Sequence, residues 1–218
     1  MNRQYKMPDG DIILASSSPT RQELLRQINL CFAVQPAHVD EDAVKAAGIA
    51  ESVPSDEIVI ELASLKAEQI ALQGDGYILG CDQILTCEGQ LFSKPQNHEH
   101  AKEQLALLAG KTHELRTAIV IYHRHQRIWH HLAISSLTMR SMTQRDLDDY
   151  CTLYYDQLVD TPGSYQIENG GAHLFTSMDG SFYDILGLPL LPLLGFLRTR
   201  GLKLEDMPEH SHTEDQTT

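Results

Sequence analysis

Apolar residues along the chain follow two periods, and together these periods predict a mixed α/β fold. Short apolar or alternating runs, which are typical of strands, cover residues 12–15, 77–87, 91–94, 114–122, 127–138 and 172–178. Apolar residues at helical spacing cover residues 19–28, 56–72, 98–109, 143–153 and 190–200. No repeat or long linker interrupts residues 10–202, so we expect residues 1–202 to form one domain.

Capping residues indicate where three of these helices begin. Ser18 is a suitable N-cap, and Pro19 suits the first helical position. Ser55 is the expected cap of the helix over residues 56–72. Thr143 and Asp146 have the spacing of a capping box. Each of these helices therefore has a local start signal in addition to its apolar periodicity.

The charge of the chain limits its partners. The formal net charge is −13, whereas a general nucleic-acid-binding protein needs a basic surface. Residues 203–218 hold five acids and one lysine without periodic apolar residues, which predicts a disordered acidic tail. No apolar run approaches the roughly 20 residues that a membrane span needs, and the four cysteines lack C-x-x-C spacing. We therefore expect a cytoplasmic protein that binds neither nucleic acid nor membrane.

Asp82 is out of place for a residue that only stabilises a strand. Residues 77–87 are otherwise almost wholly apolar, and period-two alternation places Gly80 and Asp82 on one face of the strand. A buried ionised carboxylate costs several kcal/mol unless a cation or a metal pairs with it. Asp82 therefore belongs to a ligand-binding or metal-binding site, where Gly80 would leave room for the ligand. The alternative is a structural aspartate that is paired with another side chain or exposed at a bulge.

Lys66 shares a helical stripe with apolar residues, among them Ala63 and Ile70. Such a lysine either extends along the helix surface to reach solvent, or projects into a cleft where it meets a phosphate. An acidic segment over residues 39–42 includes Glu41 and could hold a metal, although acidic clusters are usually solvated.

The turn from Ser16 to Arg21 is a candidate anion site. It joins a predicted strand to a predicted helix, so free backbone N–H groups, serine hydroxyls and the arginine converge at the helix start. The turn lacks a glycine-rich Walker pattern, and most turns of this type only cap a helix. The residues alone leave both interpretations open.

Taken in order, these segments resemble the Maf family of nucleotide pyrophosphatases, from residue 12 to about residue 201. The matching motifs are S-S-S-P-T-R-Q-E-L-L at 16–25, V-D-E at 39–41, L-A-S-L-K-A at 62–67, G-C-D-Q at 80–83, K-P at 94–95, L-A-G-K-T-H at 108–113, G-S-Y-Q-I-E-N at 163–169 and G-L-P-L at 187–190. One such match would be weak, but this many in the same order are specific.

The resemblance implies a fold of the Maf and inosine-triphosphatase type, with two lobes around an extended, twisted mixed sheet and a central cleft. It also implies hydrolysis of a nucleoside triphosphate to a nucleoside monophosphate and pyrophosphate. Asp82 and Glu41 would bind Mg²⁺ or Mn²⁺ and activate water, with Lys66 as a further catalytic residue. A homodimer is plausible.

The resemblance assigns the remaining site residues to substrate binding. Arg21 and Lys94 would neutralise phosphates together with Lys66, and Ser16 would cradle one phosphate. Gln83 and Glu168 would shape the selection of the base.

Three positions distinguish this chain from the common family pattern. Thr20 replaces the first arginine of an R-R pair, so of this pair Arg21 alone is left to contact a phosphate. Gln83 and Glu168 resemble the branch linked to 7-methyl-GTP, although residues 137–140 and 187–198 look more like a third branch. The alternatives to a pyrophosphatase are a non-catalytic nucleotide-binding regulator of cell division and a phosphatase that releases orthophosphate.

Overall fold

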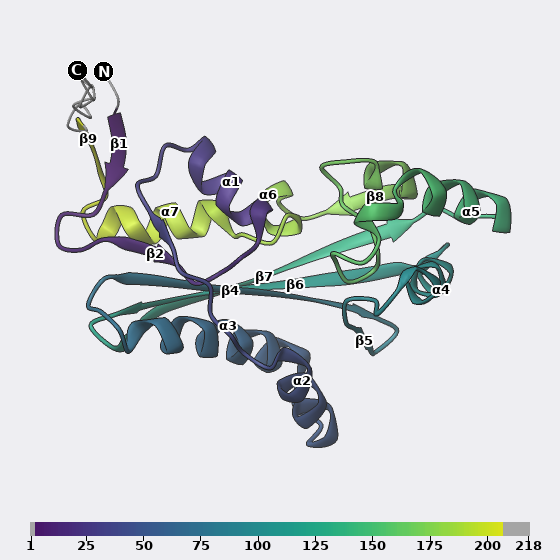
Figure 1. The fold of residues 1–218 in the computed structure, drawn as a ribbon, viewed down its shortest axis with the longest axis horizontal. Helices are drawn as coiled ribbons and strands as arrows, with labels where there is room; N and C mark the ends of the chain where they lie inside the picture. Colours follow the sequence, from purple (N-terminus) through teal and green to yellow (C-terminus); the bar gives the residue numbers. More distant parts are fainter. Residues whose placement is uncertain (1–2, 207–218) are drawn as a thin grey trace, which may run out of the picture.

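A mixed sheet runs the length of the molecule (Figure 1). The computed structural model describes residues 3–206, and within them the sheet has seven strands in the order β3-β2-β4-β6-β7-β8, with β5 paired to β4. The strands are β2 (Ile12–Leu14), β3 (Ala33–Val34), β4 (Tyr77–Cys87), β5 (Gln90–Phe92), β6 (Thr112–His123), β7 (Gln126–Met139) and β8 (Phe175–Asp179). Strand β2 is parallel to β3 and β4, and the other pairs are antiparallel.

Helices cover both faces of this sheet. They are α1 (Pro19–Gln27), α2 (Glu41–Ala50), α3 (Ser55–Ala71), α4 (His98–Leu108), α5 (Gln144–Leu153), α6 (Phe182–Ile185) and α7 (Leu190–Thr199), with short 3-10 turns at Tyr155–Gln157 and Gly171–Leu174. Figure 1 shows α1, α6 and α7 on one face and α3 on the other, while α4 and α5 lie at the far end of the long strands. Among residues 3–206, no helix is both long and apolar enough to cross a membrane.

The alternation of side chains along β6 explains why both faces are covered. Ile119 and Ile121 pack with leucines of α1 and α7, whereas Ala118 and Val120 pack with apolar residues of α3. A separate core at the other end of the strands joins α4, α5, β7 and the segment around Tyr165. The predicted α/β fold, with two lobes around an extended mixed sheet, is confirmed.

One edge of β4 is interrupted between the two lobes. Strand β2 pairs with β4 only as far as Leu79, and β5 begins to pair with it at Leu85. Within the described residues, the stretch 80–84 therefore pairs with β6 on one side only. Backbone groups and side chains at this gap are accessible to other segments, and Asp82 and Gln83 lie there.

Two of the three N-caps predicted from the sequence are confirmed in the structure. The Ser18 hydroxyl accepts a bond from the Arg21 amide, and Thr143 with Asp146 forms a capping box. The expected cap Ser55 is wrong, because α3 already includes this residue and Pro54 occupies the N-cap position. The strand expected at 172–178 is also partly wrong, because Gly171–Leu174 forms a 3-10 turn and β8 begins at Phe175.

The two ends of the described chain pair with each other. Strand β1 (Arg3–Lys6) and strand β9 (Lys203–Asp206) form a small antiparallel sheet. The predicted disordered tail of residues 203–218 therefore begins too early, since its first four residues are held by backbone pairing. Residues 207–218 lie outside the described part of the chain.

Candidate active site

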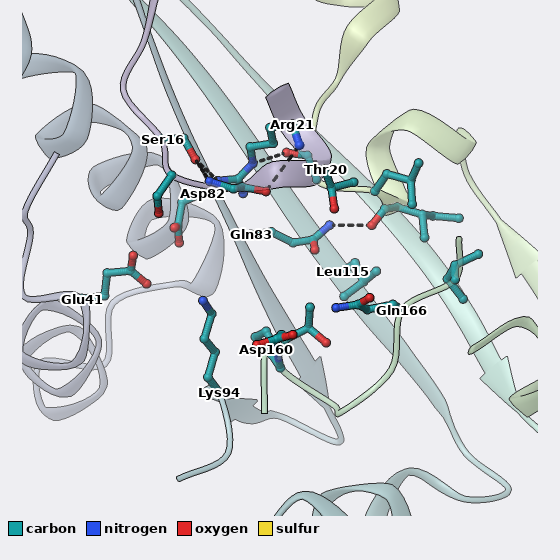
Figure 2. A pocket seen from close by; sticks show the side chains of 18 of the residues that line it. Ser16, Thr20, Arg21, Glu41, Asp82, Gln83, Lys94, Leu115, Asp160 and Gln166 are labelled. Atoms are coloured by element: carbon teal, nitrogen blue, oxygen red, sulfur yellow. Dashed lines mark hydrogen bonds between the residues drawn. The ribbon is translucent and has the colours of Figure 1, made fainter. Parts of the chain in front are cut away.

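The eight residues that the sequence singled out line one cleft at the interrupted edge of β4. They are Ser16, Arg21, Glu41, Lys66, Asp82, Gln83, Lys94 and Glu168. Figure 2 shows Ser16, Thr20 and Arg21 on one side of this cleft, with Asp160 and Gln166 on the other. Segments far apart in the sequence thus meet at the gap between β2 and β5.

A buried lysine joins the two predicted catalytic carboxylates. The Lys66 ammonium donates to Asp82 Oδ1 at 2.5 Å and to Glu41 Oε1 at 2.7 Å. Asp82 is 4% exposed and Lys66 is 8% exposed. The interpretation of Lys66 as a lysine that extends to solvent is therefore wrong, and the buried charge of Asp82 is compensated by a cation.

Gly80 allows α3 to lie close enough to β4 for this contact. Gly80 and Asp82 face α3, and a methyl group at Gly80 would overlap the Ala63 carbonyl oxygen and lie 2.9 Å from the Ala67 amide nitrogen. The expectation that Gly80 leaves room for a ligand is wrong, because the backbone of α3 fills that space. Lys66 lies on the turn of α3 between these two alanines, so the close packing brings its side chain to Asp82.

The two carboxylates have different electrostatic environments. Burial raises the pKa of Asp82 above its ordinary value, although Lys66 and Arg21 favour its ionised form. Burial acts in the same direction on Glu41, but there the attraction of Lys66, Lys45 and Lys94 outweighs it and lowers the pKa. Glu41 therefore stays ionised more readily than Asp82, whose charge depends on nearby cations.

These two carboxylates fit a divalent cation that arrives with phosphate oxygens. Asp82 Oδ2 is buried and has no hydrogen-bond partner among the described residues, so it is free to act as a ligand. Within residues 3–206, no group of three or more His, Cys, Asp or Glu side chains is placed to hold a metal. Mg²⁺ suits such a site, because it is commonly bound by one or two carboxylates together with substrate phosphates and water.

Lys45 is a site residue that sequence reasoning missed. It is one helical turn after Glu41 on α2, its side chain is 8% exposed, and its ammonium lies 3.5 Å from Glu41 Oε2. It lines the same cleft as Lys66 and the exposed Lys94. The four-residue spacing from Glu41 is the signal that could have identified it, once a helix is known to begin there.

Arg21 fixes the start of α1 against the open edge of β4. Its Nε donates to the Gly187 carbonyl oxygen at 2.8 Å, and its Nη1 donates to the Cys81 carbonyl oxygen at 3.0 Å and to Ser16 Oγ at 3.2 Å. Ser16 Oγ also accepts from the Ser18 amide. Arg21 thus has a structural role in the cleft wall, and phosphate binding by Arg21 and Ser16 stays a prediction.

Gln83 is held with its nitrogen towards the protein. Nε2 donates to Thr117 Oγ1 at 2.7 Å and to the carbonyl oxygens of Asp184 and Ile185 at 3.0 and 3.1 Å. These acceptors fix the orientation of the amide, so its oxygen is the atom that can accept a bond from a ligand.

Glu168 reaches across the cleft to Thr20. Thr20 Oγ1 donates to Glu168 Oε1 at 3.0 Å, although the two residues are 148 positions apart. Both positions distinguish this chain from the common family pattern, and the structure places them in direct contact. Asp160, Gln166 and Glu168 all belong to the segment that forms the second wall.

A buried histidine–tyrosine contact supports this wall. His113 Nε2 lies 2.7 Å from the Tyr165 hydroxyl oxygen, and Tyr165 lines the cleft. His113 is almost fully buried and its Nδ1 has no partner within the described residues. Burial lowers the pKa of His113 from 6.5 to about 4, so the ring is neutral at physiological pH.

The fold and the cleft define an α/β protein whose site is suited to a phosphorylated anion together with a divalent cation. The chain belongs to the family of Maf-like proteins, since the family model matches residues 11–200.

Three relatives illustrate this membership, and each is named as a nucleoside triphosphate pyrophosphatase. The protein of Nitrobacter hamburgensis is 39% identical over 193 residues, which cover 88% of this chain and 94% of the relative. The protein of Ruegeria pomeroyi is 40% identical over 192 residues, covering 88% and 96%. The protein of Hyphomonas neptunium is 41% identical over 189 residues, covering 87% and 96%. The similarity therefore extends over nearly the whole of each chain.

Proposed function

We propose that the cleft binds a nucleoside triphosphate with a divalent cation and hydrolyses it to a nucleoside monophosphate and pyrophosphate. The observation that carries this proposal is the contact of the buried Lys66 with the buried Asp82 and the partly exposed Glu41 at the interrupted edge of β4. Its relatives are named for the same activity. A buried acid that converges with a second acid and a cation in a cleft is typical of a functional site.

The charges of the cleft suit a triphosphate. Besides Lys66, the cations Arg21, Lys45 and Lys94 line it and would neutralise negative charge as it shifts to the leaving pyrophosphate. Asp82 and Glu41 would hold the metal, which would polarise the phosphate and lower the pKa of water. The Asp82 carboxylate would accept the proton of the water that attacks the α-phosphorus, while the bond from the α-phosphorus to the oxygen of the leaving pyrophosphate breaks.

We propose that hydrogen-bond acceptors in the cleft select the nucleobase of the substrate. Glu168, Asp160 and the oxygen of Gln83 can accept bonds or attract positive charge, whereas the amide nitrogen of Gln83 is already engaged. A guanine base presents N–H donors, and 7-methylation adds a positive charge. We therefore expect a preference for 7-methyl-GTP, which a comparison of kcat/KM for 7-methyl-GTP, UTP and dTTP tests. A preference for UTP would refute it.

One product analysis separates this activity from its two alternatives. Purified protein is incubated with a mixture of nucleotides and Mg²⁺, and pyrophosphate and orthophosphate are measured separately. A pyrophosphatase releases pyrophosphate, a phosphatase releases orthophosphate, and a non-catalytic regulator releases neither. We expect pyrophosphate, because Asp82 and Glu41 lie together in the cleft and a regulator would not need both acids.

The remaining expectations on partners and location stay predictions. The net charge of −13 disfavours nucleic acid as a partner, and we expect neither membrane binding nor an extracellular location. The four cysteines are free thiols, which is compatible with the expected reducing cytoplasm. A homodimer is testable by light scattering.

A further inference from the structure

The Lys66 ammonium occupies the space between the two carboxylates that are expected to hold the metal. It contacts Asp82 Oδ1 at 2.5 Å and Glu41 Oε1 at 2.7 Å, so one cation already bridges the pair. A divalent cation bound by the same two carboxylates would lie directly beside a buried ammonium. Two cations side by side in a site of low dielectric constant repel each other strongly.

We propose that Lys66 and the divalent cation compete for Asp82 and Glu41, so that the metal binds well only together with the nucleotide. This inference rests on the proposed function, because it uses the triphosphate to resolve the competition. The phosphates attract the ammonium, which then leaves the carboxylates to the metal. Lys66 thus changes partners during substrate binding, from two carboxylates to a phosphate.

The chemistry of lysine and the exposure of Glu41 support such an exchange. Lysine carries a compact charge on a flexible stem, so it can change partners without movement of α3. Glu41 lies at the start of α2, and its side chain is 37% exposed, whereas that of Asp82 is 5% exposed. Asp82 therefore offers a fixed oxygen, while Lys66 and Glu41 can rearrange around it.

Lys45 provides a matched control for the charge of Lys66. Both lysines line the cleft and both contact Glu41, but Lys45 approaches only Oε2, at 3.5 Å, and within residues 3–206 it forms no ion pair with Asp82. Lys66→Met and Lys45→Met each remove one positive charge and keep an apolar stem of similar length. Only the first opens the space between the two carboxylates.

The test measures Mn²⁺ affinity in the absence of nucleotide. Binding to the full chain is followed at pH 8 by electron paramagnetic resonance, for wild type, Lys66→Met and Lys45→Met. We expect Lys66→Met to bind Mn²⁺ at least about tenfold more tightly than wild type, whereas Lys45→Met changes the affinity by about threefold or less. Adding Asp82→Asn to Lys66→Met should abolish the gain, which places the ion at Asp82.

Two results would overturn the proposal. An unchanged affinity in Lys66→Met would show that the lysine does not compete, and equal gains in both lysine variants would show a general charge effect instead. If Lys66→Met does not fold, as judged by circular dichroism, Lys66→Gln takes its place with the same expectation. Pyrophosphate release by wild type is measured separately, so a failure of the proposed activity is distinguishable from a failure of the metal competition.

Discussion

Replacement of Gly80 by alanine is expected to weaken both the fold and the site, because this residue sets the distance between α3 and β4. The added methyl would overlap the Ala63 carbonyl oxygen and lie 2.8 Å from the Ala67 methyl carbon. Both neighbours lie on the buried face of α3, so the helix itself must move away, because no flexible side chain can make room. Overpacking of this kind typically costs about 1–3 kcal/mol.

The same displacement should reach the chemistry through Lys66, which lies between the two alanines on α3. A shift of about 1 Å at a catalytic group can lower turnover by about 100-fold, so Gly80→Ala should lose far more activity than its stability loss explains. Thermal unfolding should show a melting temperature lower by about 2–4 °C per kcal/mol. Pyrophosphate release is then measured well below that temperature, where the variant is folded.

Gly195 offers a matched control on α7. A methyl group there would meet no atom within 4 Å, and alanine in a helix interior is favoured over glycine by about 1 kcal/mol. Gly195→Ala should therefore be as stable as wild type or more stable, with unchanged turnover. Normal turnover in folded Gly80→Ala would refute the role given to the α3–β4 contact.

Two further predictions concern the second wall of the cleft. The pKa of the buried His113 is lowered to about 4. The stability that comes from burying the neutral ring is therefore complete above pH 6.5 and is lost as the pH falls towards 4. The loss amounts to about 3 kcal/mol, at ~1.4 kcal/mol per pKa unit. Urea unfolding at several pH values should show a flatter acid limb for His113→Phe, and an identical limb would contradict this. Thr20→Val removes the hydrogen bond to Glu168 and should lower kcat/KM for 7-methyl-GTP by about three- to tenfold. Thr20→Ser keeps the hydroxyl and should keep the wild-type kcat/KM. Equal kcat/KM values in the two variants would contradict a role for the hydroxyl.

The sequence predicted the central sheet because its strands have strong local signals. Strands β4, β6 and β7 are long, and their apolar side chains alternate or fill both faces. Asp82 could be identified from the same pattern, since a carboxylate in a buried strand needs a partner. The motif resemblance supplied the residues from other segments, and the structure places all of them at one cleft.

Helix α2 was missed because Val44 is its main apolar contact with the core, which is too little to form an apolar stripe. Lys45 is the buried residue within it, and Ile49 is largely exposed. Apolar periodicity is the main signal for a helix in a sequence, so a helix that buries a lysine instead lacks that signal. Lys45 escaped notice for the same reason.

Other features depend on contacts between distant segments, which local patterns do not specify. The close packing of α3 determines why residue 80 is glycine, and the carbonyl oxygens of Cys81 and Gly187 determine what Arg21 binds. The pairing of β1 with β9 likewise joins the two ends of the described chain. Such long-range pairings follow from the folded topology rather than from residue type.

Pyrophosphate release by Asp82→Asn, measured beside wild type with Mg²⁺ and nucleoside triphosphate, tests the proposed chemistry most directly. Asparagine keeps the shape of the side chain but removes the charge and the proton acceptor, and Lys66 retains Glu41 as a partner. We predict that the variant keeps the fold, because Glu41 still compensates the Lys66 charge, and that it loses turnover by at least about 100-fold. Near-normal pyrophosphate release by this variant would contradict the assignment of Asp82 as the centre of the reaction.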